Sequence, residues 1–263
     1  MEVLYGVHPV EEAVRSGSRQ LEQVSVAKER RDERLERLVA LCRIAGVRVS
    51  LQPRDQLTRM AKTDAHQGVI AVVKERKFLA IEDLLNAKVE GKNQFFLALD
   101  GVEDPHNFGA LLRTADAAGV DGVIVPERRS APVSGTVAKT SAGASEHVRI
   151  ARVTNIVRTL EQMKQRNVWV LGLDERGTQD YTEYDYNADC VLVLGSEGAG
   201  LHELVKKTCD FLLRIPMAGK VSSLNVSVAG AVVMYEAMRQ RRGGGPMSAP
   251  VKASGKMRKG LGS

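Results

Sequence analysis

Short apolar segments alternate with amphipathic helical segments over the first part of the chain. The alternation in LEQVSVA (21–27) predicts a strand, and VRVSL (47–51) and GVIAVV (68–73) predict two more. Between the first two strands, apolar residues follow helical spacing from 35 to 44. Residues 1–75 are therefore predicted to form a small α/β domain.

From position 93 the strand-like segments become almost continuously apolar, as in FFLALD (95–100) and CVLVLG (190–195). Strands of this kind are typical of a parallel sheet that helices cover on both faces. Further strands are expected at 122–126, 147–151, 168–173 and 211–215. We predict an α/β fold with a mostly parallel sheet for residues 93–242, preceded by the smaller α/β domain.

Two segments lack such a pattern. Residues 76–92 are charged and weakly periodic, and we interpret them as a linker with at most one short helical turn. The tail, 243–263, is rich in Gly, Ser, Pro and Lys and carries no acidic residue. This composition predicts a disordered basic tail.

Three segments of the second domain carry candidate chemistry. They are DPHNFGALLRTADAAG (104–119), LVLGSEGAGL (192–201) and IPMAGKVSSLNVSVAGAVVMYEAM (215–238), and each joins a strand end to a helix through a polar loop. Loops at the carboxyl ends of strands converge on one crevice, where open α/β sheets bind ligands. The polar side chains that stand out among small or apolar neighbours are Asn107, Arg113, Glu197, Ser223 and Asn225.

The glycine-rich segment GSEGAG (195–200) has the spacing G-x-x-G-x-G and follows a late strand. Both features count against a dinucleotide-binding loop, which has G-x-G-x-x-G in the first βα turn. Glycines at a strand end let a flat ligand approach the backbone closely. The alternative is a turn that only redirects the chain, and the carboxylate of Glu197 argues against it.

The other candidates also have plain structural alternatives. The last segment predicts a helix cap at Ser222 or Ser223, followed by a nearly all-apolar helix that we expect to be buried. Asn225, at the start of that helix, is either a site residue or a capping or packing amide. Arg113 either binds a phosphate or ribose through its planar guanidinium or pairs on the helix surface with Asp116.

The three segments resemble the signature motifs of the SpoU (TrmH-like) family of RNA ribose 2′-O-methyltransferases. The amino-terminal domain, through YGVHPVEEAV (5–14) and AHQGVIAVV (65–73), resembles the RNA-binding module of the branch that methylates a guanosine of 23S ribosomal RNA. The resemblance covers residues 1–242. It implies methyl transfer from S-adenosylmethionine, an RNA partner, a carboxy-terminal trefoil knot, and a homodimer whose active sites borrow residues across the interface.

The resemblance also implies roles for individual residues. Asn107, Glu197 and Asn225 would form a polar frame at the catalytic site. Because a guanidinium stays protonated in proteins, we expect Arg113 to stabilise the developing alkoxide while phosphate or water accepts the proton. His106 is an alternative base, although a histidine after proline in a turn is often merely exposed. The cofactor site would comprise Leu194, Gly195, Ile215, Met217, Ser223 and Leu224, and no metal is implied.

Bulk charge does not indicate an RNA partner by itself. The formal net charge is +6, but the tail contributes four of these charges, and residues 93–242 hold 17 basic and 18 acidic side chains. RNA contacts therefore require local basic patches. The three cysteines lie far apart in apolar segments, which predicts buried thiols and neither disulfides nor a zinc site. Without a secretory signal or a membrane-length apolar run, we expect a soluble cytoplasmic protein.

Three alternatives stay open at this point. The first is the same chemistry on tRNA or on another ribosomal RNA nucleotide. The second is a non-catalytic RNA-binding factor, against which the intact set of polar site residues argues. The third is a small-molecule α/β enzyme, which the additional amino-terminal domain disfavours.

Overall fold

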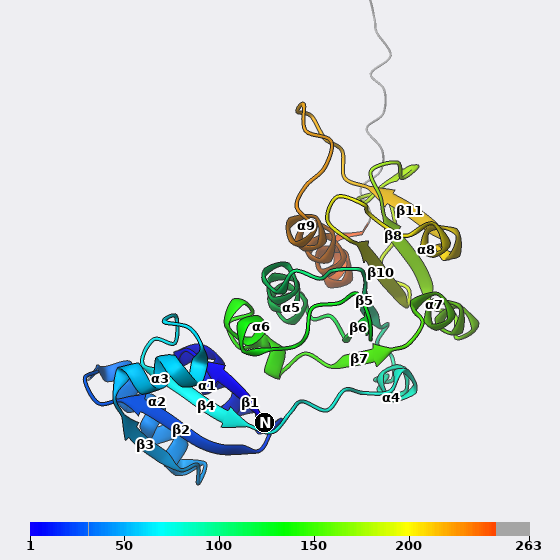
Figure 1. The fold of residues 1–263 in the computed structure, drawn as a ribbon. Helices are drawn as coiled ribbons and strands as arrows, with labels where there is room; N and C mark the ends of the chain where they lie inside the picture. Colours follow the sequence, from blue (N-terminus) through cyan, green and yellow to red (C-terminus); the bar gives the residue numbers. More distant parts are fainter. Residues whose placement is uncertain (31, 246–263) are drawn as a thin grey trace, which may run out of the picture.

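The computed structural model describes residues 1–30 and 32–245, which form two α/β units (Figure 1). The sheet of the amino-terminal unit has the order β1–β4–β2–β3, in which only β2 and β3 pair in parallel. The elements of this unit are β1 (Glu2–Tyr5), α1 (Val7–Ser16), β2 (Leu21–Ala27), α2 (Glu33–Ile44), β3 (Val49–Gln52), α3 (Arg54–Ala61) and β4 (Val69–Val73). The strands predicted in this region are β2, β3 and β4.

The second unit contains a seven-stranded sheet of order β7–β6–β5–β10–β8–β11–β9, and every pairing in it is parallel. Its strands are β5 (Phe95–Asp100), β6 (Gly122–Pro126), β7 (Ile150–Val153), β8 (Trp169–Leu173), β9 (Gln179–Asp180), β10 (Cys190–Gly195) and β11 (Phe211–Arg214). The predicted parallel sheet is therefore confirmed. The strand expected at 147–151 begins later, because a helical turn continues to Val148, whose N–H donates to the carbonyl of Ala144.

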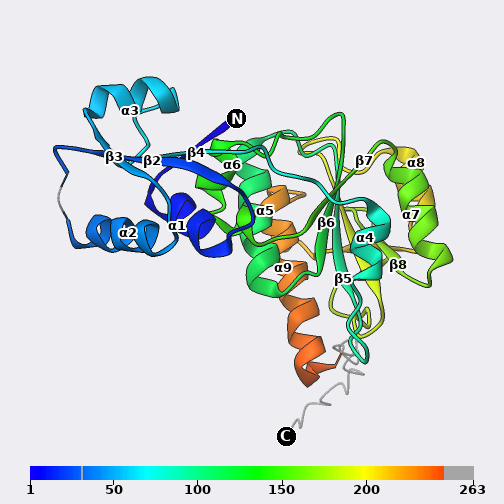
Figure 2. The same ribbon diagram turned by 90° about the horizontal axis from the view of Figure 1, so that it is seen from below.

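Helices cover both faces of the large sheet (Figures 1 and 2). One core lies under α5 and α9, and the other under α4, α7 and α8. The helices of this unit are α4 (Ile81–Asn86), α5 (Pro105–Ala118), α6 (Gly135–Thr140), the 3-10 turn η1 (Ala144–Glu146), α7 (Ile156–Gln165), α8 (Glu203–Thr208), α9 (Val226–Arg239) and the π-helical turn η2 (Gln240–Gly244). None of the helices in the described ranges is long and apolar enough to cross a membrane.

The segment interpreted as a linker is attached to the second unit along much of its length. Leu79 forms a bridge with Ala151 of β7, and the ring of Phe78 lies 3.7 Å from the guanidinium of Arg152. The apolar residues of α4 are part of the core beneath α7 and α8. The domain boundaries stay a prediction, but residues 78–86 pack against the second unit and do not form a free tether.

The two units meet through α6, which contributes to two cores. Val137 belongs to the core under α5, whereas its neighbour Ala138 belongs to the core of the amino-terminal unit. A Cβ atom at Gly135 would lie 2.4 Å from the carbonyl oxygen of Val3, so only glycine permits this approach of α6 to β1. The hydroxyl of Tyr5 donates to Thr136 Oγ1 at 3.1 Å. The units are therefore packed directly against each other.

A buried ion pair crosses the same interface. Arg19 of the amino-terminal unit pairs with Glu146 of η1 at 2.8 Å, and their side chains are 1% and 0% exposed. The guanidinium also pairs with Glu2. Burial raises the pKa of the Glu2 carboxyl, although Arg19 opposes that shift. Because each charge has lost most of its water, each one depends on its partners across the interface.

The helix after Asn225 is only partly buried in one chain, so the expectation of burial on every side was wrong for the single chain. Gly230, Val233 and Met234 face the core, but Val228 and Tyr235 are 49% and 48% exposed. The predicted tail begins at the end of η2, and from residue 246 onward it lies outside the described residues. Cys42 and Cys190 are buried as predicted, whereas Cys209 is only half-buried, so the prediction of a buried thiol was wrong there.

Breaking the buried ion pair should destabilise the folded chain. We expect Glu146→Ala to lower the free energy of unfolding by about 3–5 kcal/mol, because Arg19 would stay buried with one carboxylate fewer. The control Glu33→Ala removes a carboxylate that is 83% exposed and pairs with Arg37, and it should cost less than about 1 kcal/mol. Urea denaturation of the two variants measures the difference, and equal losses would contradict the role given to Glu146.

Candidate functional site

The carboxyl ends of the parallel strands meet at one edge of the large sheet. β5 ends at Asp100, β10 at Gly195 and β11 at Arg214. Asp100 and Gly195 are register partners, and β11 lies one strand beyond β8 from β10. The loops that leave this edge lead to α5, α8 and α9. This is the edge at which open α/β sheets bind ligands.

Asn107, Glu197 and Asn225 form a closed hydrogen-bonded triangle at this edge. Asn107 Nδ2 donates to Glu197 Oε2 at 2.9 Å. Asn225 Nδ2 donates to Asn107 Oδ1 at 3.0 Å and to Glu197 Oε1 at 3.1 Å. Each carboxylate oxygen of Glu197 thus accepts a hydrogen bond from a side-chain amide. Hydrogen bonds to an ionised acceptor are stronger than those between neutral groups. The structure brings together three residues that the sequence places 90 and 28 positions apart.

The start of α5 determines the position of Asn107. Asp104 caps this helix by accepting a hydrogen bond from the N–H of His106 at 2.8 Å, and Pro105 occupies the first helical turn. Asn107 therefore lies in that turn, where it is buried. The nitrogen and the oxygen of its side-chain amide bond to the other two members of the triangle.

Asn225 caps α9 and belongs to the triangle at the same time. Its Oδ1 accepts hydrogen bonds from the backbone N–H of Ser227 at 2.9 Å and from the hydroxyl of Ser227 at 2.6 Å. The predicted cap at Ser222 or Ser223 was wrong, because the helix begins later, at Val226. The interpretation of Asn225 as a capping amide is therefore confirmed, and its role as a site residue stays a prediction.

Gly195 fits the shape of its own loop. A Cβ atom there would lie 2.1 Å from the carbonyl carbon of Gly200, where the loop folds back on itself. Ser196 and Gly200 exchange two backbone hydrogen bonds of 3.0 Å, which close the loop around Glu197. The expectation that this glycine leaves room for a ligand needs correction, because the backbone of the loop fills that space.

The other predicted cofactor residues differ in exposure. Leu194 is buried at the end of β10 and Ile215 is half-buried after β11. Met217 and Leu224 are 36% and 37% exposed, and Ser223 lies in the same exposed loop. The loop between β11 and α9 therefore presents apolar side chains and backbone polar groups beside the triangle.

Arg113 and His106 lie outside the triangle. Arg113 is exposed on α5, and within residues 1–30 and 32–245 it forms neither a hydrogen bond nor an ion pair. The alternative surface pair with Asp116 is therefore not formed in this structure. His106 is exposed one residue before Asn107. In a single chain Arg113 is thus exposed and makes no hydrogen bond to the polar frame within the described residues.

The sequence analysis missed one polar pair at this edge. Asp100 is buried and accepts a hydrogen bond from the backbone N–H of His202 at 2.8 Å, while its other oxygen lies 2.9 Å from His202 Nδ1. Arg129 lies 3.3 Å from the other ring nitrogen. These contacts fasten the start of α8 to the end of β5. An acidic residue that ends an apolar strand was the feature that could have revealed the pair.

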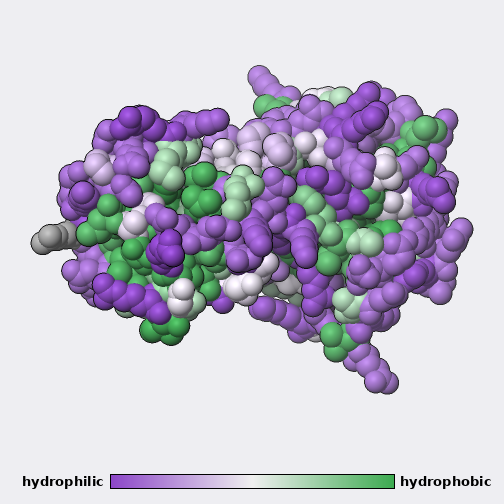
Figure 3. Space-filling model, turned by 60° about the horizontal axis from the view of Figure 1, so that its bottom comes forward, coloured by the Kyte–Doolittle hydropathy of each residue, from purple (hydrophilic) through white to green (hydrophobic). Residues whose placement is uncertain are grey.

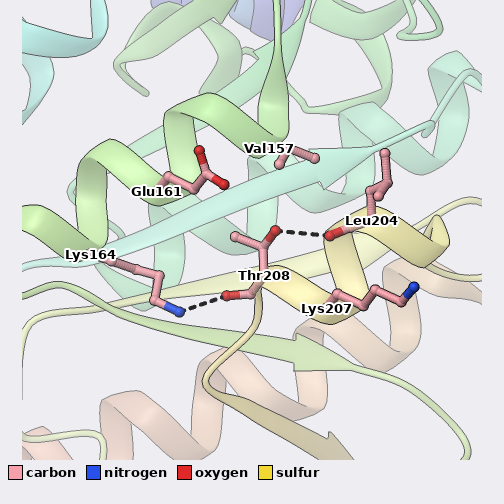
Figure 4. A pocket seen from close by; sticks show the side chains of 6 residues that line it. All are labelled: Val157, Glu161, Lys164, Leu204, Lys207 and Thr208. Carbon is pink, nitrogen blue, oxygen red and sulfur yellow. Dashed lines mark hydrogen bonds between the residues drawn. The ribbon is translucent and has the colours of Figure 1, made fainter.

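A separate cavity of about 430 Å³ lies between α7 and α8. Figure 4 shows its lining, in which Lys164 Nζ donates to the carbonyl of Thr208 and the hydroxyl of Thr208 donates to the carbonyl of Leu204. No predicted site residue lines it. Within the described part of the chain, no group of three or more His, Cys, Asp or Glu side chains is placed to hold a metal ion.

Comparison with known proteins identifies the family. A model of the SpoU rRNA Methylase family matches residues 94–235, which include all three members of the triangle. The chain belongs to the SpoU rRNA methylase family. A second model, described as RNA 2′-O ribose methyltransferase substrate binding, matches residues 3–79 of the amino-terminal unit.

Two curated SpoU relatives are similar along almost their whole length. The 23S rRNA (guanosine-2′-O-)-methyltransferase RlmB of Pseudomonas aeruginosa is 45% identical over 245 residues, covering 91% of this chain and 97% of that protein. RlmB of Ralstonia nicotianae is 43% identical over 240 residues, with 91% and 96% covered. Among solved structures, the SpoU methyltransferase AviRb from Streptomyces viridochromogenes in complex with AdoMet has a TM-score of 0.78 and 27% identity, covering 92% of this chain and 91% of its own.

Replacing the buried amide by a carboxylate tests the triangle. In Asn107→Asp, two carboxylates would lie within hydrogen-bond distance, so one of them must hold a proton. A carboxyl pKa that is raised in the folded state makes the protein less stable as pH increases, because the folded state binds more protons than the unfolded state. We therefore expect the unfolding free energy of this variant to fall by about 1–3 kcal/mol relative to wild type between pH 5 and pH 8.

The matched control is Asn86→Asp, which introduces the same charge at an exposed amide bonded to Arg166. It should follow the pH dependence of the wild-type protein. Urea denaturation at several pH values measures both variants. Parallel pH profiles for Asn107→Asp and Asn86→Asp would show that the triangle does not form.

Proposed function

We propose that this chain transfers a methyl group from S-adenosylmethionine to the ribose 2′-hydroxyl of a guanosine in 23S ribosomal RNA. The triangle of Asn107, Glu197 and Asn225 at the ligand-binding edge carries this proposal, because it unites the three signature segments in one site. Two RlmB relatives that match over 91% of this chain support the choice of substrate. A substrate in ribosomal RNA implies a cytoplasmic protein.

The residues beside the triangle suit S-adenosylmethionine. Met217 and Leu224 offer partly exposed apolar side chains for an adenine ring, and exposed backbone groups around Ser223 offer hydrogen bonds. When bound, the cofactor supplies a methyl group on a sulfonium, which is a good leaving group. The proposed cofactor site comprises Leu194, Ile215, Met217, Ser223 and Leu224. Gly195 would contribute through its backbone groups only, because Gly200 fills the space beside its Cα atom.

The remaining chemistry falls to the residues of the chain. The triangle fixes the loops that align the ribose hydroxyl with the methyl group, and such alignment contributes several kcal/mol to catalysis. Arg113 is proposed to stabilise the negative charge that develops on the 2′-oxygen, since its guanidinium stays protonated. A phosphate oxygen or water accepts the proton. Asn107, Arg113, Glu197 and Asn225 form the proposed catalytic set.

A homodimer is part of the proposal. Val228 and Tyr235 leave an apolar face of α9 uncovered in one chain, and Arg113 is exposed and not bonded to its own triangle within the described residues. A C₂ dimer would cover the apolar face of α9 and would bring Arg113 of the partner subunit to the triangle. The proposal includes the carboxy-terminal knot as well, supported by the return of α9 from the end of β11 to pack against α5 and β10.

The proposed function is tested by mapping ribose methylation in cells with and without the gene. We expect one 2′-O-methylguanosine of 23S ribosomal RNA to disappear, and calorimetry to show binding of S-adenosylmethionine to the purified protein. Loss of a methyl group from tRNA instead would reassign the substrate. Unchanged methylation together with no cofactor binding by folded protein would favour a non-catalytic RNA-binding factor.

Arg113→Ala should reduce turnover and leave cofactor affinity and thermal stability unchanged. We expect a loss of about 100-fold or more, the scale of losing one electrostatic contact to the transition state. Arg113→Lys should recover only part of this loss, because an ammonium lacks the planar fork of donors. Single-turnover methylation measures the rates, with Asp116→Ala as the surface control. A rate near wild type in Arg113→Ala would remove it from the catalytic set.

Mixed dimers test whether Arg113 acts across the interface. Subunits with Arg113→Ala and subunits with Glu197→Ala should each be inactive alone. After exchange, half of the dimers are heterodimers, and each heterodimer has one intact site of two, so about a quarter of wild-type activity should return. No recovery, with subunit exchange verified by mass spectrometry, would place Arg113 in the site of its own chain.

A further inference from the structure

Two cationic side chains and a histidine, contributed by both units, meet at the junction between the units and outside the triangle. His8 lies in the first turn of α1, Arg34 in the first turn of α2, and Lys139 near the end of α6. We call these three residues the junction cluster. Arg34 Nη2 lies 2.7 Å from His8 Nδ1. Lys139 reaches across from the other unit, and its Nζ is 2.8 Å from where a Cβ atom of Gly6 would be.

The junction cluster is not neutralised by carboxylates. In the described ranges, no ion pair involves Arg34 or Lys139. Two nearby acids in the sequence have other partners, because Glu12 lies 2.8 Å from His147 and Glu33 pairs with Arg37. Burial and the charge of Arg34 lower the pKa of Lys139. Like charges that are held together without a counter-charge create a local field that favours an anion.

The backbone at this point also favours an anion. α1 has ten residues, and its N-cap residue Gly6 supplies no side-chain cap. In its first turn the N–H of Val7 donates to Gln67 Oε1 at 3.3 Å, and Pro9 has no N–H. Gly6 has φ +97, a conformation that glycine permits, and it leaves the space that Lys139 occupies. The dipole of α1 is positive at this end. The charged side chains and the dipole of α1 therefore both favour an anion at this point.

The junction cluster is connected to the proposed catalytic site through one residue. Thr140 follows Lys139, and its hydroxyl donates to the carbonyl of Pro105 at 3.2 Å. Pro105 lies in the turn of α5 that carries Asn107. Because α6 is packed into the cores of both units, Lys139 is held in a fixed relation to both.

We propose that the junction cluster binds a backbone phosphate of the RNA substrate, so that both units hold the same strand. The proposal rests on the proposed function and deepens it. A planar guanidinium suits the paired oxygens of a phosphate, and the lysine adds a point charge. RNA is favoured over an acidic protein segment because the amino-terminal unit belongs to a substrate-binding family, while bulk charge supplies little attraction and local patches must provide it.

The test compares Lys139→Gln, Arg34→Gln and the control Lys207→Gln. Lys207 is exposed on α8, which lies on the side of the catalytic unit away from the amino-terminal unit (Figure 1), so the control removes the same charge elsewhere. Filter binding of an unmodified 23S ribosomal RNA transcript is measured at several salt concentrations. We expect the two cluster variants to bind about five- to tenfold more weakly, with the salt slope reduced by about one, and the control to match wild type.

Several results would overturn the proposal. One is wild-type affinity and salt slope in both cluster variants, and another is an equal loss in Lys207→Gln. A third is a loss of RNA affinity that occurs only together with a change in the mass of the assembly, measured by sedimentation. This result would assign the cluster to a contact between subunits. Failure of the proposed function is distinguishable, because it would appear as absent cofactor binding and methylation in the wild-type protein, whereas this test depends on RNA binding alone.

Discussion

The carboxylate of Glu197 is the contact on which the proposed site depends, because it joins three segments that are remote in sequence. Its two oxygens accept amide hydrogen bonds from α5 and from the start of α9. The two helices pack close to each other and to the sheet only because a residue without a side chain lies where they meet. A Cβ atom at Gly230 of α9 would lie 2.6 Å from the side chain of Leu111 and 2.7 Å from that of Leu194. Close packing of α9 therefore determines where Asn225 can reach.

Much of the fold follows from local sequence pattern. Strands that are apolar on both faces indicate a parallel sheet, because such a sheet is covered on both sides. Phe95–Asp100 and Cys190–Gly195 are strands of this kind, and both are buried. The candidate site was predictable to the same degree, since polar residues at strand ends converge in such sheets. Asn107, Glu197 and Asn225 are the clearest case. The pattern could not supply the contacts of individual side chains: Arg113 forms neither of its two expected contacts within the described residues.

Tertiary contacts explain where the expectations failed. The segment 76–92 has a charged, linker-like composition, yet three apolar residues of α4 within it belong to the core beneath α7. The space beside Gly195 is filled by Gly200, a contact between two residues of one loop that spacing alone does not reveal. The helix α9 is nearly all-apolar in sequence, yet Val228 and Tyr235 stay exposed in the single chain. Figure 3 shows apolar surface on the amino-terminal unit as well. Two apolar residues of that unit, Ile44 and Leu51, are 85% and 62% exposed.

The shared helix α6 has a consequence for how such proteins can change. Val137 and Ala138 are adjacent in the chain but belong to the interiors of different units. Gly135 and Gly143 let the amino-terminal unit approach so closely that a methyl group at either position would collide with Val3 or Glu12. Recombination that joined this catalytic unit to a different amino-terminal module would have to preserve the surface that α6 fits. Exchange of modules in this architecture is thus limited by shape at a six-residue helix and not by the length of the connection.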